Sequence, residues 1–198
     1  MRGFARRLSS SLLRRTPDVD AHGLCAGGLV RIAEVAGSSK GLGAFAAAPL
    51  AGGLEIGRYA GEVITLGEML TRYGGLGSDA ADEYEASNAQ AEWIAERRTH
   101  GIGVTGTYIF NAGQCPVRRR DVLIDGEDLR VSNWTRYLNH STTPNLDVSY
   151  EVLPPEQSHR LGTPVVRFIT RRPIAAGGEL LFDYGDGLNV SDLLGFED

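Results

Sequence analysis

Short stretches in which hydrophobic and polar residues alternate recur along the chain, and Gly or Pro separates most of them. This pattern is typical of β-strands bounded by tight turns. The strands that it predicts lie at residues 29–35, 54–59, 61–64, 122–125, 146–152 and 165–169. The last two are joined by a Pro-rich loop and are expected to form a β-hairpin. Many short strands with little helical periodicity predict a β-rich fold, mainly β with short helices.

Helical periodicity is confined to two segments. Thr65 and Glu68 have the spacing of a capping box, in which two side chains bind the first backbone amides of a helix. The apolar residues that follow at helical spacing are Leu66, Met69, Leu70 and Tyr73. A second helix is expected at residues 89–98. The rest of 74–120 is irregular, and we interpret this region as an insertion within one domain.

The first fifteen residues differ in composition from the rest of the chain. Their basic residues are Arg2, Arg6, Arg7, Arg14 and Arg15. No acidic residue precedes Asp18, and residues 9–11 are all serine. This composition is typical of an organelle transit peptide, and a disordered basic leader is the alternative. We therefore interpret residues 1–25 as a leader, which under the first interpretation directs the protein to a plastid or mitochondrion.

The charge balance changes once this leader is set aside. The chain has 20 basic and 25 acidic residues, a net charge of −5, and removing the five arginines leaves 15 basic residues and a net charge of −10. An acidic body argues against direct binding of nucleic acid and suits a basic protein or peptide as partner. No stretch reaches the roughly 20 apolar residues that span a bilayer, so no membrane association is expected.

Cysteine and histidine give no sign of a metal site. Cys25 and Cys115 are far apart in the sequence, whereas a structural zinc ion usually requires four ligands. The histidines are His22, His100, His140 and His159, and none has the spacing of a metal-binding motif. No G-x-S-x-G sequence is present, which argues against a hydrolase nucleophile. We expect neither a disulfide framework nor a bound metal.

Four short motifs carry candidate chemistry. The glycines at 41–43 let the backbone approach a ligand closely. Tyr59 precedes a glycine and an acid, Asn139 and His140 place an amide next to an imidazole before a proline turn, and a strand candidate at 179–185 ends in Asp-Tyr-Gly. An ordinary turn or strand explains each motif taken alone. Together they describe a polar pocket on a β scaffold.

In this order, the four motifs resemble the SET domain of protein lysine methyltransferases. The family pattern consists of a G-x-G loop, a Y-x-G-E strand, an R-[FY]-x-N-H-S-x-x-P-N segment and a final E-L-x-F-D-Y-G strand. The matching segments are 41–43, 59–62, 136–145 and 179–185, and the resemblance covers roughly residues 28–187. It implies small curved β-sheets and a C-terminal pseudoknot that brings Asn139 and His140 next to the strand of Tyr184. Such threading is rare, so local patterns alone do not predict it.

The resemblance implies methyl transfer from S-adenosylmethionine to a lysine side chain. Tyr184 and Tyr59 would be the catalytic residues, and Tyr59 and Phe182 would line the lysine channel. The residues expected to bind the cofactor are Lys40, Gly41, Leu42, Gly43, Arg136, Asn139 and His140. Arg136 and Asn145 could instead maintain the shape of their motif. A tyrosine at the position of Phe182 would crowd the amine, so phenylalanine predicts di- or trimethylation.

Departures from the family pattern leave the substrate open. Thr142 stands where many histone-directed members have Cys, and residues 188–198 contain no Cys for a zinc cluster. The lysine channel would therefore be closed differently, for example by Leu193, Leu194 and Phe196. The substrate would be a histone tail or another basic protein, and the resemblance favours the nucleus. The alternative function is a catalytically inactive SET module that binds a basic peptide or a partner protein.

Overall fold

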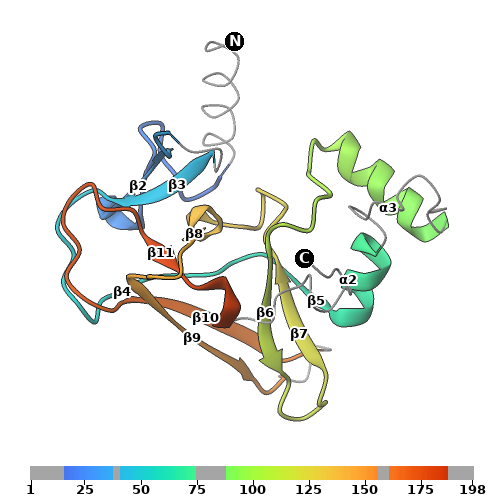
Figure 1. Ribbon diagram of the computed structural model, residues 1–198. Coiled ribbons are helices and arrows are strands. Elements are labelled where there is room, and N and C mark those ends of the chain that lie inside the picture. The colour runs from blue at the N-terminus through green and yellow to red at the C-terminus, as the bar shows by residue number, and fades with distance from the viewer. Residues whose placement is uncertain (1–15, 38–40, 75–87, 156–160, 187–198) are drawn as a thin grey trace.

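The computed structural model describes residues 16–37, 41–74, 88–155 and 161–186. Within these ranges the chain forms small β-sheets, with two short helices on one side (Figure 1). This architecture confirms the predicted β-rich fold. The predictions for residues 1–15, for Lys40 and for the tail at 188–198 lie outside the described residues.

The first sheet is antiparallel and carries the glycine motif. It consists of β1 (Leu24–Cys25), β2 (Val30–Glu34) and β3 (Leu42–Ala46), with β2 in the middle. The 3₁₀ turn η1 (Ala26–Gly28) joins β1 to β2. β2 confirms the strand predicted at residues 29–35, and its pairing with β3 fixes the segment that follows the glycine motif.

The second sheet contains the predicted hairpin. β9 (Leu146–Leu153) and β10 (Thr163–Thr170) are antiparallel over their whole length, and β4 (Glu55–Arg58) pairs with the other edge of β10. β10 is the central strand, and its residues Val166 and Phe168 are completely buried. Every second residue of this strand from Val166 is buried, and its β-branched and aromatic residues explain why the sequence pattern locates it correctly.

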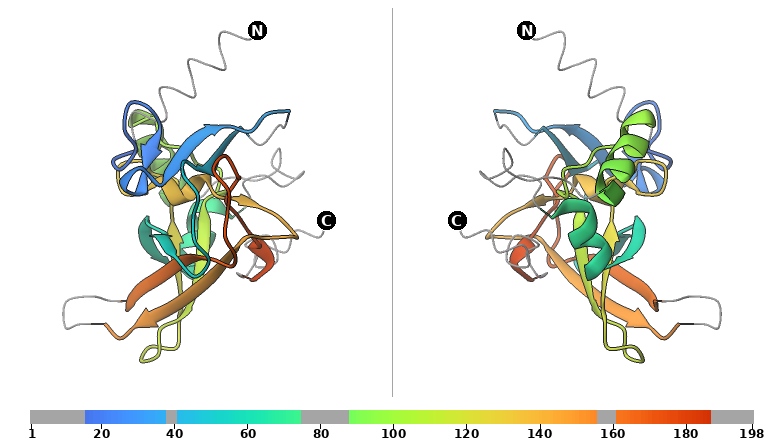
Figure 2. Two further views of the ribbon diagram at one scale, coloured as in Figure 1. Left: turned by 90° about the vertical axis from the view of Figure 1, so that its left-hand side faces the viewer. Right: turned by 90° about the vertical axis from the view of Figure 1, so that its right-hand side faces the viewer.

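The third sheet has the order β5 (Glu62–Thr65), β7 (Asp121–Asp125) and β6 (Ile109–Gln114). The sequence pattern predicts β5 and β7 but not β6. The reason is that the buried Asn111 is polar, Gly113 has a φ of 89°, and the register shifts between Asn111 and Gln114. Part of the region interpreted as an insertion is thus built into a sheet. Figure 2 shows the β6–β7 and β9–β10 hairpins projecting from the same end of the molecule.

The helices α2 (Leu66–Tyr73) and α3 (Asn88–Thr99) confirm the two predicted helices and lie together near β5 (Figure 1). The capping box forms as expected: the amide of Glu68 donates to Thr65 Oγ1 at 3.1 Å, and the amide of Thr65 donates to Glu68 Oε2 at 2.7 Å. A small hydrophobic core beneath the helices contains Ile64, Met69, Tyr73 and Leu123. These helices are therefore attached to the third sheet through a core of their own.

Two short strands far apart in the sequence form the last sheet. β8 (Asn139–His140) follows the 3₁₀ helix η2 (Trp134–Tyr137), and β11 (Leu181–Phe182) precedes η3 (Tyr184–Asp186). β8 and β11 pair in parallel near the centre of the molecule (Figure 1). This pairing confirms the expected proximity of the two motifs. The strand predicted at 179–185 is shorter than expected, because η3 begins at Tyr184.

The main hydrophobic core draws on all four sheets. Its completely or almost completely buried members include Val30, Ile32, Ala44, Leu50, Leu138, Leu146, Val166, Phe168 and Leu180. Leu138 adjoins β8 and Leu180 adjoins β11 in the sequence. The burial of these neighbours anchors both short strands, which two residues of backbone pairing alone would not hold.

Residues 16–25 belong to the fold, which corrects their interpretation as part of a leader. The hydroxyls of Thr16 and Tyr137 are hydrogen-bonded at 2.9 Å, and Asp18 Oδ1 accepts from the amide of Trp134 at 3.0 Å. Val19 lies in the main core. The N-terminal segment therefore braces η2, the element that leads into β8.

Candidate active site

The candidate site is built around the parallel pair of β8 and β11. This pair places Phe182 opposite His140. The backbone amide of Tyr184 donates to Nδ1 of His140 at 3.1 Å. Nδ1 of the imidazole is therefore the acceptor in this arrangement, and Nε2 is the other ring nitrogen. The last motif is thus attached directly to the Asn-His motif.

Asn145 joins the same two motifs through its side-chain amide. Its Nδ2 donates to the carbonyl of Glu179 at 2.7 Å, and its Oδ1 accepts from the amide of Leu181 at 2.9 Å. The backbone amide of Asn145 also donates to the carbonyl of Leu181 at 3.1 Å. The side chain therefore acts as a clamp on the backbone that enters β11.

The glycine motif lies against Asn139. Asn139 Nδ2 donates to the carbonyl of Leu42 at 3.2 Å and to Glu179 Oε1 at 2.9 Å. A β-carbon on Gly43 would lie 2.9 Å from that carboxylate oxygen and 3.1 Å from Asn139 Nδ2. Gly41 has a φ of 76°, and a β-carbon there would meet nothing within 4 Å. The second glycine thus makes room for Asn139, while the first borders open space.

Tyr59 lies in an aromatic environment, at the end of β4. Its ring centroid is 5.5 Å from that of Phe110 and 6.4 Å from that of Phe168. Its hydroxyl donates to the carbonyl of Tyr108 at 2.7 Å. Burial raises the pKa of this hydroxyl, so it remains protonated at physiological pH.

Tyr184 is half exposed, but its hydroxyl is held by the protein. The hydroxyl donates to the carbonyl of Leu138 at 2.8 Å, and the ring lies 5.3 Å from the His140 ring and 4.7 Å from the Phe182 ring. Burial of this end raises the pKa of Tyr184 to about 12, and the nearby Tyr108 adds to the increase. The ring thus has one open side while its hydroxyl is a fixed, neutral group.

Phe182 lies at the centre of the aromatic cluster. Its ring is 5.1 Å from Phe168, 6.4 Å from Phe110 and 4.7 Å from Tyr184. The side chain is buried, with 7% of the residue exposed. The structure therefore brings together Tyr59 and Phe182, predicted to line the lysine channel, and Tyr184, predicted to be catalytic, in one cluster with shared aromatic neighbours.

Tyr108 and Phe110 belong to this cluster and were missed by the sequence analysis. Phe110 contacts both Tyr59 and Phe182, and the Tyr108 carbonyl receives the Tyr59 hydroxyl. Phe110 lies in the unpredicted strand β6, and Tyr108 immediately precedes that strand. Two aromatic residues at alternate positions in an otherwise irregular region were the signal that could have located them.

Arg136 does not contact Asn139 or His140 through any hydrogen bond of the described residues. Its Nη1 donates to the carbonyl of Glu127 at 3.0 Å, and its guanidinium stacks 3.8 Å from the centre of the Tyr108 ring. Its Nε is buried and has no hydrogen-bond partner within the described part of the chain. Arg136 and Tyr108 both line a cavity of about 600 Å³. The guanidinium thus shapes its motif and keeps one donor unused.

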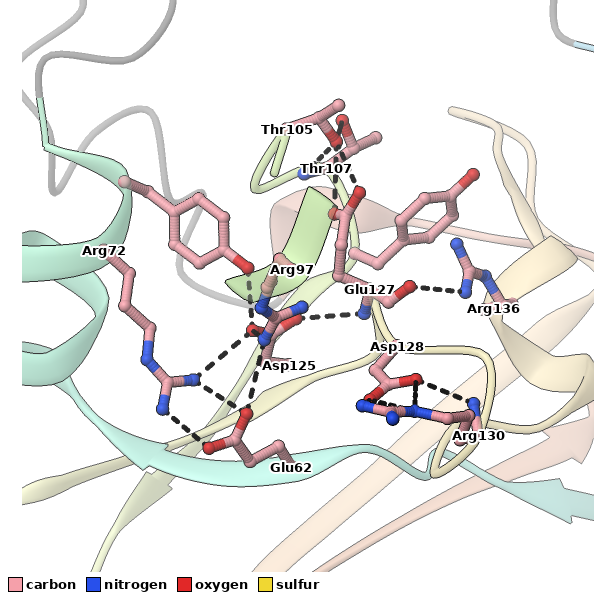
Figure 3. Close-up of polar contacts among 12 residues, drawn as sticks. Glu62, Arg72, Arg97, Thr105, Thr107, Asp125, Glu127, Asp128, Arg130 and Arg136 are labelled. Atoms are coloured by element: carbon pink, nitrogen blue, oxygen red, sulfur yellow. Dashed lines mark hydrogen bonds and ion pairs between the residues drawn. The ribbon is translucent and has the colours of Figure 1, made fainter. Parts of the chain in front are cut away.

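Glu62, the acid of the Y-x-G-E motif, lies in an ion network with two arginines (Figure 3). It forms two hydrogen bonds with Arg72, at 2.8 and 2.6 Å, and one with Arg97 at 3.3 Å. Both arginines also face the buried Asp125. The acid of the motif therefore attaches α2 and α3 to the sheet.

The described ranges contain no group of three or more His, Cys, Asp or Glu side chains arranged to hold a metal ion. They also contain no helix that is long and apolar enough to cross a membrane.

The fold and the site together define a class of protein. In this class, small β-sheets hold a C-terminal strand that leads to a tyrosine beside an Asn-His strand, and a glycine motif lies next to the asparagine. Residues 41–185 match the family model of the SET domain. The chain therefore belongs to the SET-domain family.

Solved structures resemble the chain in fold. One is the Polycomb repressive complex 2 of Chaetomium thermophilum, in an autoinhibited conformation and bound to S-adenosylmethionine. It is 22% identical with a TM-score of 0.54, and the match covers 83% of this chain and 16% of that chain. Another is the SET8 protein of Cryptosporidium, 22% identical with a TM-score of 0.47, covering 79% of this chain and 57% of that one. No curated protein sequence matches the chain.

Proposed function

We propose that this chain is an S-adenosylmethionine-dependent protein-lysine N-methyltransferase. One observation carries the proposal: the backbone of Tyr184 is bound to His140 while its hydroxyl is bound to the carbonyl of Leu138. A fixed phenol therefore stands beside the Asn-His pair, where its oxygen can orient an amine for methyl transfer. Membership of the SET-domain family supports the reaction class.

The residues present fit the methyl donor. When bound, S-adenosylmethionine supplies a methyl group on a positively charged sulfur. The open backbone at Gly41, together with Leu42, Gly43, Asn139 and His140, offers amide and carbonyl groups for its binding. Lys40 and Arg136 are the basic candidates for the carboxylate at the amino-acid end of the donor, by their charge.

The two tyrosines suit the orientation of a lysine amine. The hydroxyl hydrogens of Tyr59 and Tyr184 are both given to backbone carbonyls. Each oxygen can therefore still accept a hydrogen bond from an amine N–H, which would direct the nitrogen lone pair. The surrounding aromatic rings disfavour a charged ammonium, because burial without a counter-charge lowers the pKa of an amine. We therefore assign two contributions to the protein: it keeps the lysine amine neutral, and it holds the amine in a fixed orientation.

Phe182 sets the number of methyl groups in this proposal, and we expect di- or trimethylated product. In Phe182→Tyr, a new hydroxyl would enter the cluster between Phe168, Phe110 and Tyr184 and reduce the space beside the amine. Mass spectrometry of the product should then show a shift to monomethyl-lysine. Strict monomethylation by the unaltered protein, unchanged in Phe182→Tyr, would contradict this prediction.

Gly43→Ala tests the cofactor side of the site. The new β-carbon would lie 2.8 Å from Val35 Cγ2 and would press on the Glu179 carboxylate and the Asn139 amide. We expect affinity for S-adenosylmethionine to fall about tenfold, equivalent to about 1.4 kcal/mol, measured by calorimetry. Gly67→Ala is the control, because a β-carbon there meets only Thr65 Oγ1 at 3.9 Å. Equal affinities of the two variants would count against a role of Gly43 in shaping the site.

The substrate that we propose is a basic protein or peptide, such as a histone tail, because the body of the chain is acidic. The second candidate is a module that binds such a peptide without catalysis. The intact set of Tyr59, Asn139, His140 and Tyr184 favours the enzyme. A nuclear location would suit a histone substrate. The location can be tested by imaging fluorescent fusions of the protein with and without residues 1–20.

The experiment that tests the proposal is transfer of labelled methyl groups to histones and to a cell extract, together with calorimetry of S-adenosylmethionine binding. Binding with transfer to lysine supports the enzyme. Binding without transfer supports the inactive module. Folded protein that does not bind S-adenosylmethionine would overturn the proposal.

A further inference from the structure

The carboxylate of Asp125 lies at the meeting point of the ion network and the aromatic cluster. The residue is completely buried. Its Oδ2 accepts from the Tyr73 hydroxyl at 2.7 Å and from Arg97 Nη2 at 2.9 Å, and Arg72 Nη1 lies 3.6 Å away (Figure 3). A buried carboxylate needs such partners, since desolvation of an unpaired charge is costly. One oxygen is thereby tied to α2 and α3.

The other oxygen fixes the backbone that follows β7. Asp125 Oδ1 accepts from the amide of Glu127 at 2.9 Å, across Gly126 (Figure 3). This side-chain-to-backbone bond two residues ahead defines a local turn. The path of Gly126 is therefore set by the same carboxylate that binds the helices.

Gly126 is linked in turn to Tyr59 through one carbonyl group. The amide of Gly126 donates to the carbonyl of Tyr108 at 2.8 Å, and the Tyr59 hydroxyl donates to the same oxygen at 2.7 Å. Tyr59 and the turn after Asp125 thus share one acceptor. A shift of Gly126 would move this acceptor or break one of the two bonds.

The residues along this chain of contacts are closely packed at two glycines. A β-carbon on Gly126 would lie 2.8 Å from the Tyr59 hydroxyl oxygen, and one on Gly61 would lie 2.3 Å from the carbonyl oxygen of Asp125. Both glycines therefore let backbone and phenol approach at contact distance. At such close contacts a displacement of one group is transmitted to the group that it touches.

We propose that Asp125 is a positioning residue, which sets the place of the Tyr59 hydroxyl by fixing the turn at Gly126 and the carbonyl of Tyr108. The proposal rests on the proposed function only in taking Tyr59 as a wall of the lysine channel. A purely structural ion pair would contribute to stability and leave the Tyr59 hydroxyl unchanged.

Asp125→Asn removes the charge while keeping the size of the side chain. With tyrosine labelled by ¹³C at Cζ, the Tyr59 resonance, assigned with Tyr59→Phe, reports on the hydroxyl without any need for activity. We expect this resonance to move in Asp125→Asn and in Tyr73→Phe, which removes one hydrogen bond to Asp125. It should stay in place in Asp128→Asn, which alters a carboxylate of the same loop that is paired with Arg130.

The kinetic counterpart is a fall in kcat for a lysine peptide of at least about tenfold in Asp125→Asn, with affinity for S-adenosylmethionine unchanged within about twofold. An unmoved Tyr59 resonance in folded Asp125→Asn would overturn the proposal. If Asp125→Asn does not fold, an unmoved resonance in Tyr73→Phe overturns it instead. An unaltered protein without methyl transfer would contradict the proposed function, whereas the resonance would still test the positioning.

Discussion

Replacing Tyr184 with Phe is expected to lower the rate of lysine methylation by about 100-fold or more. The Phe182 and His140 contacts of the ring would be retained, but the hydroxyl held by the carbonyl of Leu138 would be lost. If that oxygen orients the amine, its loss leaves the nitrogen in many unproductive directions, and misplacement of a reacting group typically costs about this much. Single-turnover transfer followed by mass spectrometry measures the effect.

Two accompanying measurements separate this role from a structural one. Affinity for S-adenosylmethionine should stay within about twofold, because the backbone amide of Tyr184 still binds His140. Tyr137→Phe is the matched control: it removes a buried hydroxyl that is bonded to Thr16 and lies outside the cluster, so it should cost stability but not kcat. Full activity of Tyr184→Phe would remove Tyr184 from the mechanism.

The pH dependence of the methylation rate should reflect the ionisation of the lysine amine and not that of the Tyr184 hydroxyl. With the pKa of Tyr184 at about 12, its hydroxyl remains protonated from pH 7 to about pH 10. The rate should rise with pH as the fraction of neutral lysine increases, without a fall caused by ionisation of the phenol.

The largest expected effect on stability is that of Gly61→Ala. The new β-carbon would lie 2.3 Å from the carbonyl oxygen and 2.6 Å from the carbonyl carbon of Asp125, and both belong to the paired backbone of β7. Backbone cannot rotate away as a side chain can, so the pairing of β5 with β7 would have to open. We expect a loss of about 3 kcal/mol or more in the free energy of unfolding, measured in urea.

Gly67→Ala should instead raise the free energy of unfolding. Gly67 lies in the first turn of α2, where a β-carbon meets no atom closer than 3.9 Å. Alanine in a helix is more favourable than glycine by up to about 1 kcal/mol. Both variants add one methyl group to a glycine, at Gly61 where the β-carbon would clash and at Gly67 where it would not. Equal stabilities would show that β5 and β7 lie farther apart than in the structure.

Most regular elements were predictable from local patterns, and the exceptions have specific causes. β10 consists largely of β-branched and aromatic residues with one face packed on the core, and α2 begins with its capping box. β6 was not predicted, because it buries the polar Asn111 and because Gly113 has a left-handed backbone conformation. Tyr108 and Phe110 were missed for the same reason, so the predicted aromatic cluster lacked them.

The roles of charged residues were the least predictable part of the site. The motif alone does not reveal whether Glu62 faces the cluster or the helices, because strand geometry leaves that choice to the partner elements. Asp125 looks like the ordinary end of a strand. Its importance arises only when Arg72, Arg97 and Tyr73, which come from two helices, converge on its carboxylate.

The sequence by itself determined the β-rich class, both helices and the family, because these depend on local periodicity, capping and the order of four motifs. The resemblance predicted that the Asn-His motif lies beside the strand of Tyr184, and only the tertiary structure decided which contacts join the two. The parallel pairing of β8 with β11, the clamp of Asn145 and the shared carbonyl of Tyr108 all join residues distant in the chain. Such contacts depend on burial and on the path of the backbone through the whole domain, so no local pattern encodes them.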